Sequence, residues 1–163
     1  MTTKLTPQQQ RAKFKKRLTE ECEFLWSFCV RARAAFQCEL PNASFIDCKG
    51  IPQGAHLVTR SVSHVKYDLR NGRSLCQAHH VYFTYKPEFW SVAVANKWPE
   101  DWLYVIGDKW KGVRKPEELT DTFLRLLNEA KAYPRFIEQY LTRFEKLQAW
   151  YEENKARFSD PVR

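Results

Sequence analysis

The sequence predicts a mostly helical α+β fold, in which a small core is flanked by N- and C-terminal helices. Three observations support this prediction. Apolar residues recur at three- and four-residue steps near both ends of the chain, the segment around residues 38–54 is rich in turn formers, and all four histidines lie between His56 and His80. Helical periods at both ends, around an irregular and histidine-rich middle, indicate a small core held between helices.

The first predicted helix covers about residues 6–36. Thr6 and Pro7 are a typical start, a capping residue followed by proline at the first helical position. Six apolar residues then fall on one face: Leu18, Cys22, Leu25, Trp26, Cys29 and Val30. This stripe predicts that the helix packs against a core, so that Cys22 and Cys29 are interpreted as core residues.

The middle of the chain predicts short strands and turns. Residues 38–54 hold little apolar surface of their own, so a bound metal would stabilise them. His56-Leu57-Val58 could begin a short strand, and Asn71-Gly72 is the strongest hairpin-type turn in the sequence. The segment 77–85 is compatible with a helix that ends before Pro87.

Helical patterns return after this segment. We expect helices over residues 88–96, from Pro116 to about Ala132, and from Pro134 onwards. The last carries a stripe that suits a core face or the face of a homodimer: Phe136, Ile137, Tyr140, Leu141, Phe144, Leu147 and Tyr151. The expected segments are therefore a basic N-terminal helix (1–37), a core (38–95) and a helical C-terminal extension (96–163).

Charge and hydropathy restrict the partners. The net charge is +8, and residues 1–37 hold eight basic against three acidic residues, while residues 49–73 hold five against one. Such an excess favours polyanions, although a solvated basic surface would give the same composition. No apolar run is long enough to cross a bilayer, and the N-terminus has no signal-peptide core, so we expect a cytoplasmic protein without a membrane partner.

Two groups of side chains carry the candidate chemistry. Cys76 and His79 form a C-x-x-H half-site, and with Cys38 and Cys48 they could complete a tetrahedral zinc shell. The alternative is that Cys38 and Cys48 are ordinary buried thiols and that no zinc is bound. The second group is His56, Asn71 and His80. On a helix His80 points about 100° away from His79, so it would face a different site.

The motifs that carry these residues resemble the HNH endonuclease family, with its ββα-metal fold, and most closely its phage-type and NinG-like recombination nucleases. They run Gly54-Ala-His56-Leu-Val-Thr-Arg60-Ser, then Tyr67-Asp68-Leu-Arg-Asn71-Gly72, then Leu75-Cys76-x-x-His79-His80. The resemblance covers about residues 28–95. It implies a zinc-stapled ββα core and, for a phage protein, a place in the host cytoplasm.

By this resemblance His56 is the general base, Asn71 holds the loop, His80 binds a catalytic Mg²⁺ or Mn²⁺, and Arg60 lies near the scissile phosphate. Cys38, Cys76 and His79 match zinc positions. Ala55 stands where many members have a metal-binding Asp or His, so phosphate, water, His64 or Asp68 would have to complete the shell. The second cysteine of the first knuckle is also missing, and Cys48 is its candidate replacement.

The leading hypothesis is a metal-dependent endonuclease that cleaves DNA phosphodiesters in phage-type DNA processing or recombination. Seven basic residues are expected to contact the DNA backbone: Lys13, Lys15, Lys16, Arg17, Lys66, Arg70 and Arg73. One alternative is a non-catalytic, zinc-containing module that binds nucleic acid. Another is an interaction protein that acts through its aromatic C-terminal helices.

Overall fold

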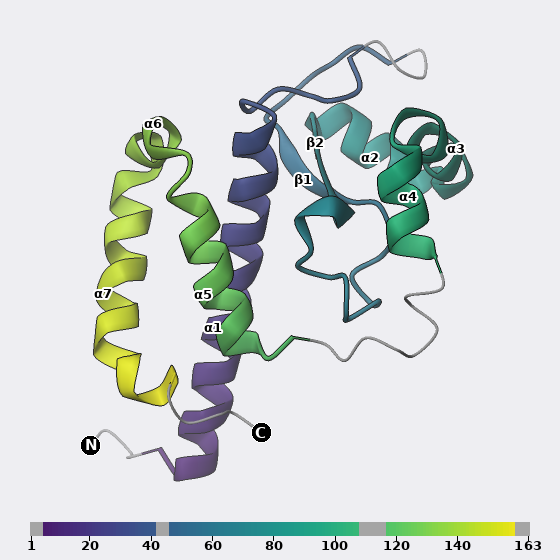
Figure 1. Ribbon diagram of the computed structural model, residues 1–163. Helices are drawn as coiled ribbons and strands as arrows, with labels where there is room; N and C mark the ends of the chain where they lie inside the picture. Colours follow the sequence, from purple (N-terminus) through teal and green to yellow (C-terminus); the bar gives the residue numbers. More distant parts are fainter. Residues whose placement is uncertain (1–4, 42–45, 108–116, 159–163) are drawn as a thin grey trace. The chain divides into compact units, whose positions relative to one another are not determined.

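The computed structural model describes residues 5–41, 46–107 and 117–158, and the fold is mostly helical with a two-stranded antiparallel sheet (Figure 1). The chain divides into a helical unit (residues 1–25 and 117–163) and a hairpin unit (residues 26–116). These bounds differ from the three expected segments, because the N-terminal helix contributes to both units. Pro116, the expected start of a helix, lies outside the described residues, as do residues 42–45 of the turn-rich segment.

Helix α1 (Pro7–Arg33) begins at the cap that the sequence predicts. Thr6 Oγ1 accepts the N–H of Gln9 (3.2 Å), and the N–H of Thr6 donates to Gln9 Oε1 (2.8 Å). This reciprocal pair satisfies backbone donors that a helix start would leave without partners. At the other end Ala35 and Phe36 take φ values of 50° and 56°, which turn the chain out of the helix at Arg33.

The helical unit combines the first part of α1 with α5 (Leu119–Ala130), α6 (Pro134–Ile137), η3 (Glu138–Tyr140) and α7 (Leu141–Phe158). The ring of Phe14 stacks on Trp150, with centroids 5.7 Å apart. Phe136 and Leu147, from the apolar stripe near the C-terminus, are buried. This part of the stripe therefore lies in the core of the unit. No helix in residues 5–41, 46–107 or 117–158 has the length and apolar character needed to cross a membrane.

The hairpin unit follows the order strand, strand, helix. Strand β1 (Gln53–His56) pairs with β2 (Gly72–Leu75), and α2 (Gln77–Tyr85), α3 (Pro87–Lys97) and α4 (Pro99–Ile106) follow. The register runs from Gln53 opposite Leu75 to His56 opposite Gly72. Two local expectations were wrong: β1 ends at His56 instead of beginning there, and Asn71-Gly72 is no tight turn, because Asn71 ends the short helix η1 (Leu69–Asn71) and Gly72 begins β2.

Two glycines let the end of α1 approach the hairpin. A Cβ on Gly72 would lie 2.8 Å from the Trp26 ring, and one on Gly54 would lie 3.0 Å from it. The helix can therefore contact the strands directly, and a side chain at either position would separate them. The buried core of the unit consists of Leu40, Ala55, Leu57, Leu75, Phe83, Trp90, Val94 and Val105.

Candidate functional site

Three cysteines and a histidine of the hairpin unit converge on one point: Cys38, Cys48, Cys76 and His79. Their ligand atoms all lie within 4.8 Å of one another. The Nδ1 atom of His79 is 3.6 Å from the sulfurs of Cys38 and Cys48 and 3.1 Å from that of Cys76. A tetrahedral zinc site has an S–N edge of about 3.6 Å. The Cys/His cluster could therefore bind a metal such as zinc, and Cys48 does join the other three.

The local structure fixes three of these side chains. Cys76 directly precedes α2, and His79 lies in the first turn of that helix with its ring fully buried. Next to Cys38, the N–H of Glu39 donates to the Ser74 carbonyl (2.8 Å), and a carboxylate oxygen of Glu39 accepts the N–H of Ser74 (2.6 Å). These bonds tie the segment after α1 to β2, beside the start of α2.

The fourth side chain, Cys48, depends on a close approach of the backbone. The carbonyl of Lys49 accepts the N–H of Ala78 in α2 (3.1 Å). Gly50 follows with a φ of 80°, and a Cβ on it would lie 2.7 Å from the Cβ of Gln77. Only glycine suits both the positive φ and the short distance. Gly50 thus allows the loop that carries Cys48 to rest on α2.

The thiols of the cluster have shifted pKa values. Burial opposes ionisation of Cys76, but the backbone N–H groups of His79 and Lys49 donate to its sulfur and lower the pKa of Cys76 to about 7. Desolvation and the neighbouring sulfurs of Cys38 and Cys76 raise the pKa of Cys48 to about 11. Thiolates this close repel one another, and a divalent cation would remove that repulsion, because metal binding displaces thiol protons. The donor set therefore fits a thiophilic metal ion.

Asn71 holds the loop that joins the strands. Its fully buried amide accepts the N–H of Val58 (2.9 Å) through Oδ1 and donates through Nδ2 to the carbonyl of Val65 (3.0 Å). Its own carbonyl accepts the N–H of Leu57 (2.9 Å). One side chain thus closes residues 58–71 into a compact loop, directly beside the end of β1.

His56 is the last residue of β1, and a stacking contact and a hydrogen bond fix its ring. The ring stacks on Trp26, with centroids 3.8 Å apart and planes 13° apart. Its Nε2 lies 2.9 Å from the carbonyl oxygen of Lys66. A carbonyl can only accept, so Nε2 carries the proton, and the lone pair of the neutral ring is on Nδ1. The indole N–H of Trp90 donates to the backbone carbonyl of His56 (3.1 Å).

His80 lies in α2, and a residue at the start of β1 orients its ring. Its Nδ1 is 2.5 Å from Oε1 of Gln53, the first residue of that strand. Nδ1 therefore donates, and the lone pair of the neutral ring is on Nε2. Burial and then the charge of the exposed Arg60 lower the pKa of His80, which favours the neutral, metal-binding form. Because β1 is about 10 Å long from Gln53 to His56, the two histidines are anchored near its opposite ends.

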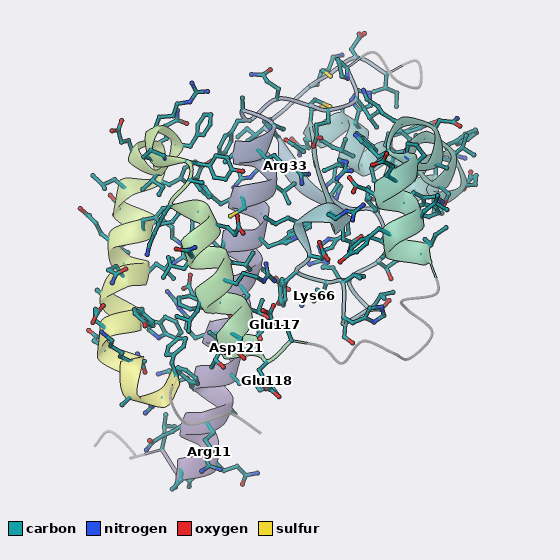
Figure 2. The ribbon with its side chains drawn as sticks, viewed as in Figure 1. Arg11, Arg33, Lys66, Glu117, Glu118 and Asp121 are labelled. Atoms are coloured by element: carbon teal, nitrogen blue, oxygen red, sulfur yellow. The ribbon has the colours of Figure 1, made fainter. Side chains whose placement is uncertain are left out.

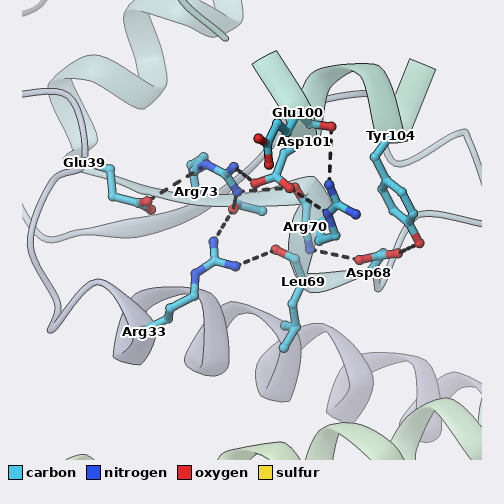
Figure 3. Close-up of polar contacts among 10 residues, drawn as sticks. Arg33, Glu39, Asp68, Leu69, Arg70, Arg73, Glu100, Asp101 and Tyr104 are labelled. Atoms are coloured by element: carbon cyan, nitrogen blue, oxygen red, sulfur yellow. Dashed lines mark hydrogen bonds and ion pairs between the residues drawn. The ribbon is translucent and has the colours of Figure 1, made fainter. Parts of the chain in front are cut away.

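Neither Ala55 nor Asp68 is placed to complete a metal shell at His80. Ala55 is 4% exposed and belongs to the core of the hairpin unit, so this position faces apolar side chains. The carboxylate of Asp68 accepts the N–H of Arg70 and the hydroxyl of Tyr104, both at 2.9 Å (Figure 3). Asp68 thus stabilises its loop.

The basic residues expected at DNA differ in how accessible they are. Lys13, Lys15 and Lys16 are exposed on the first part of α1, the part on which Figure 2 labels Arg11. Arg17 forms an ion pair with the buried Glu21 (2.6 Å). The ammonium of the half-buried Lys66 lies over the ring of Tyr67, 4.8 Å from its centroid.

Arg73 and Arg70 take part in a network that stabilises the hairpin unit (Figure 3). The Arg73 side chain is 3% exposed and forms an ion pair with Asp101, and Arg70 donates to the same carboxylate (2.6 Å). Arg33 donates to the carbonyl of Gly72 (2.7 Å). Arg73 was expected to contact DNA, but its guanidinium is buried and cannot reach a phosphate on the surface. Arg70 remains 44% exposed.

Sequence reasoning did not single out the residues that orient the histidines. Trp26 belongs to the apolar stripe of α1, where it looks like any core residue, and Gln53 stands among turn formers without a motif around it. Both contacts depend on segments that are distant in the chain. No protein-family model matches this chain, and comparisons with curated proteins and with solved structures find no match.

Proposed function

We propose that this protein is a metal-dependent endonuclease of the HNH type, which hydrolyses phosphodiester bonds in DNA. One observation carries the proposal. A histidine ends the first strand of a hairpin, a buried asparagine closes the loop before the second strand, and another histidine lies in the helix that follows. We further propose that the Cys/His cluster holds a structural zinc ion, which joins the segments around Cys38 and Cys48 to α2.

His56 is the general base of the proposed reaction. Its hydrogen bond to the Lys66 carbonyl fixes the tautomer, so Nδ1 can take a proton from a water molecule. The face of Trp26 restricts the ring to one plane. A base held in this way keeps its lone pair in a constant direction, which is what positioned proton transfer requires.

His80 is the proposed ligand of the catalytic Mg²⁺ or Mn²⁺. Gln53 orients the ring so that Nε2 can bind the ion, and the lowered pKa of His80 keeps that nitrogen unprotonated. When bound, the ion polarises the phosphate and stabilises the leaving oxyanion. Since Ala55 lies in the core, the other ligands would be phosphate oxygens and water. With one nitrogen ligand, we expect Mn²⁺ to support more activity than Mg²⁺.

Exposed positive charge in each of the two units supports DNA as the substrate. Arg60 is exposed and acts electrostatically on His80, so it can contribute charge near a bound phosphate. The exposed lysines of α1 (Lys13, Lys15 and Lys16) suit contacts with the DNA backbone that do not depend on sequence. Such contacts predict binding that weakens steeply as the salt concentration rises.

The test is cleavage of supercoiled plasmid by the purified protein with Mg²⁺, Mn²⁺ or EDTA. His56→Gln keeps a donor for the Lys66 carbonyl but has no basic nitrogen, and it should slow cleavage by about 10²–10⁴-fold. Asn96→Ala changes an exposed side chain of α3 that has no role in the proposed reaction, and it should cleave normally. Full activity in His56→Gln, or activity that survives EDTA, would contradict the proposal.

A non-catalytic zinc-containing module that binds nucleic acid is the second candidate, and the core position of Ala55 favours it. A module of this kind needs the Cys/His cluster and the basic surface but no metal at His80. It predicts DNA binding without cleavage in Mg²⁺, Mn²⁺, Co²⁺ or Ni²⁺, and equal DNA affinity for the wild type and His80→Ala. Cleavage that disappears in His80→Ala but persists in Thr84→Ala, one turn further along α2, would exclude it.

A further inference from the structure

The helical unit contains a cavity of about 610 Å³ that includes none of the proposed catalytic residues. It lies between the first turns of α1 and the last turns of α7. Eight residues line it: Leu5, Gln10, Lys13, Phe14, Arg17, Trp150, Asn154 and Arg157. Its volume is within the range of pockets that bind small molecules, about 300–1,000 Å³.

The charges of this lining favour an anion. Three of the eight lining residues are basic and none is acidic. Lys13 and Arg157 are exposed, so their cationic groups are accessible to a ligand. Arg17 pairs with Glu21, but the same carboxylate also binds Arg143 (2.5 Å), so these three side chains together keep a positive charge. A ligand with one or more phosphate or carboxylate groups would complement the cavity.

The aromatic part of the lining favours a planar ligand. The half-buried Trp150 stacks on the buried Phe14, with ring planes 25° apart, and Phe158 packs against Trp150 edge-on at 5.9 Å. The indole is thus held in a fixed plane while part of it remains accessible. The guanidinium of Arg157 lies over the Phe14 ring, 5.6 Å from its centre, so a cation contacts the ring on which Trp150 stacks. A fixed aromatic ring beside cations is how proteins bind nucleotide bases without reading sequence.

We propose that this cavity binds a single nucleotide unit, with its base on Trp150 and its phosphate between Lys13 and Arg157. Gln10 and Asn154 add amide groups that can bond to a base edge. An inorganic anion would use the cations alone, and an apolar acid would leave the amides unused. The nucleotide can be free or part of a single strand, since both present the same chemistry. The proposal does not depend on nuclease activity, because the cavity contains none of the proposed catalytic residues.

Calorimetric titration of the full-length protein tests the proposal with four probes: deoxyadenosine monophosphate, a four-nucleotide deoxyoligonucleotide, inorganic phosphate and decanoate. We expect both nucleotide probes to bind and the other two to bind much more weakly. Equal affinity for the two nucleotide probes would identify a free nucleotide as the ligand, and tighter binding of the oligonucleotide would identify a single strand. Binding of decanoate without the mononucleotide, or no binding of either nucleotide probe, would overturn the proposal.

Charge-matched variants locate the site. Lys13→Gln and Arg157→Gln should each weaken mononucleotide binding by about tenfold, the usual effect of losing one bond to a charged group. Arg11→Gln and Lys155→Gln remove one positive charge from the same helices outside the lining and should bind like the wild type. An equal loss in these controls would overturn the proposal in favour of diffuse attraction. Trp150→Leu should weaken nucleotide binding but not phosphate binding; if it fails to fold, the exposed glutamine variants decide.

Discussion

The Cys/His cluster and the pair His56 and His80 lie within the same 43 residues, but their donor atoms are arranged differently. The four ligand atoms of the cluster face one another within 4.8 Å. Each histidine of the pair instead bonds to a protein oxygen, the Lys66 carbonyl or the Gln53 amide. A closed set of donors suits a structural ion, whereas oriented rings with fixed tautomers suit chemistry on a ligand.

The difference is clearest at His79 and His80, which are neighbours in α2. His79 is fully buried against the three sulfurs, and His80 is half-buried beside Gln53. One helix can serve both groups because successive side chains point about 100° apart. Changes to the cluster should therefore cost folding, and changes to the pair should cost activity while the fold remains intact.

The largest effect should follow from Cys76→Ser, which removes a ligand of the cluster. Structural zinc contributes about 10–16 kcal/mol of apparent binding free energy in small zinc domains, comparable to the whole stability of a domain. We expect the hairpin unit to lose both zinc and cooperative unfolding, as measured by metal analysis and thermal melting. Cys22→Ser is the control, because that thiol donates to the Leu119 carbonyl in the helical unit. Full zinc content and an unchanged Tm in Cys76→Ser would remove the distinction between the two groups.

Asn71 belongs to the same sequence motif as His56 and His80, but it is fully buried, as structural residues are. It therefore tests whether that motif also contributes to stability. Asn71→Ala leaves the N–H of Val58 and the carbonyl of Val65 without their partner inside the loop. An unsatisfied buried group costs about 1–3 kcal/mol, so we expect a loss of about 3 kcal/mol in urea unfolding, with zinc still bound in the native state. Asn96→Ala, at an exposed position of α3, should change stability little. A loss below about 1 kcal/mol would contradict the structural role of Asn71.

The parts that sequence predicts well are those determined by near neighbours. The start of α1 follows from Thr6 and Gln9, three residues apart, and its buried face follows from a repeat along one helix. The convergence of Cys76 and His79 is local too, because both lie at the start of α2. These features depend on spacings that a short stretch of sequence contains.

The expectations that failed depend on distant contacts. Asn71-Gly72 has the composition of a tight turn, but Gly72 is required where Trp26 and Val30 approach β2. Arg73 was expected to contact DNA, but its side chain is buried and forms an ion pair with Asp101, which is distant in the sequence. The core position of Ala55 likewise depends on helices that follow it. Which side of a strand is buried, and which charges are paired, is decided by tertiary packing.

Asp101→Asn should have an intermediate effect, on the segment of η1 and β2 that contains Arg70 and Arg73. Burial opposes ionisation of Asp101, but hydrogen bonds from Arg70 and Arg73 hold its pKa below the usual range. Because the folded pKa lies below the unfolded value, the contribution to stability is complete above about pH 4 and is lost as the pH falls further. The variant should lose about 2 kcal/mol at pH 7, since Arg73 stays buried without this partner, and its stability should fall less below pH 4. Urea unfolding between pH 3 and pH 7 measures both effects; an identical acid dependence in the two proteins would contradict this role.

The smallest effect should follow from Gln53→Ala, which removes the acceptor that orients His80 but leaves the cluster untouched. Loss of such a partner of a metal-binding histidine typically weakens metal affinity by about 10–100-fold, and we expect the lower end because Gln53 is only half-buried. The Mn²⁺ concentration for half-maximal cleavage should rise about tenfold, with the rate at saturating Mn²⁺ within a few-fold of the wild type. Gln53→Glu keeps an acceptor and should need no more Mn²⁺ than the wild type. Loss of zinc or a lower Tm in Gln53→Ala would mean that β1 supports the cluster as well, and that the two groups are not separable.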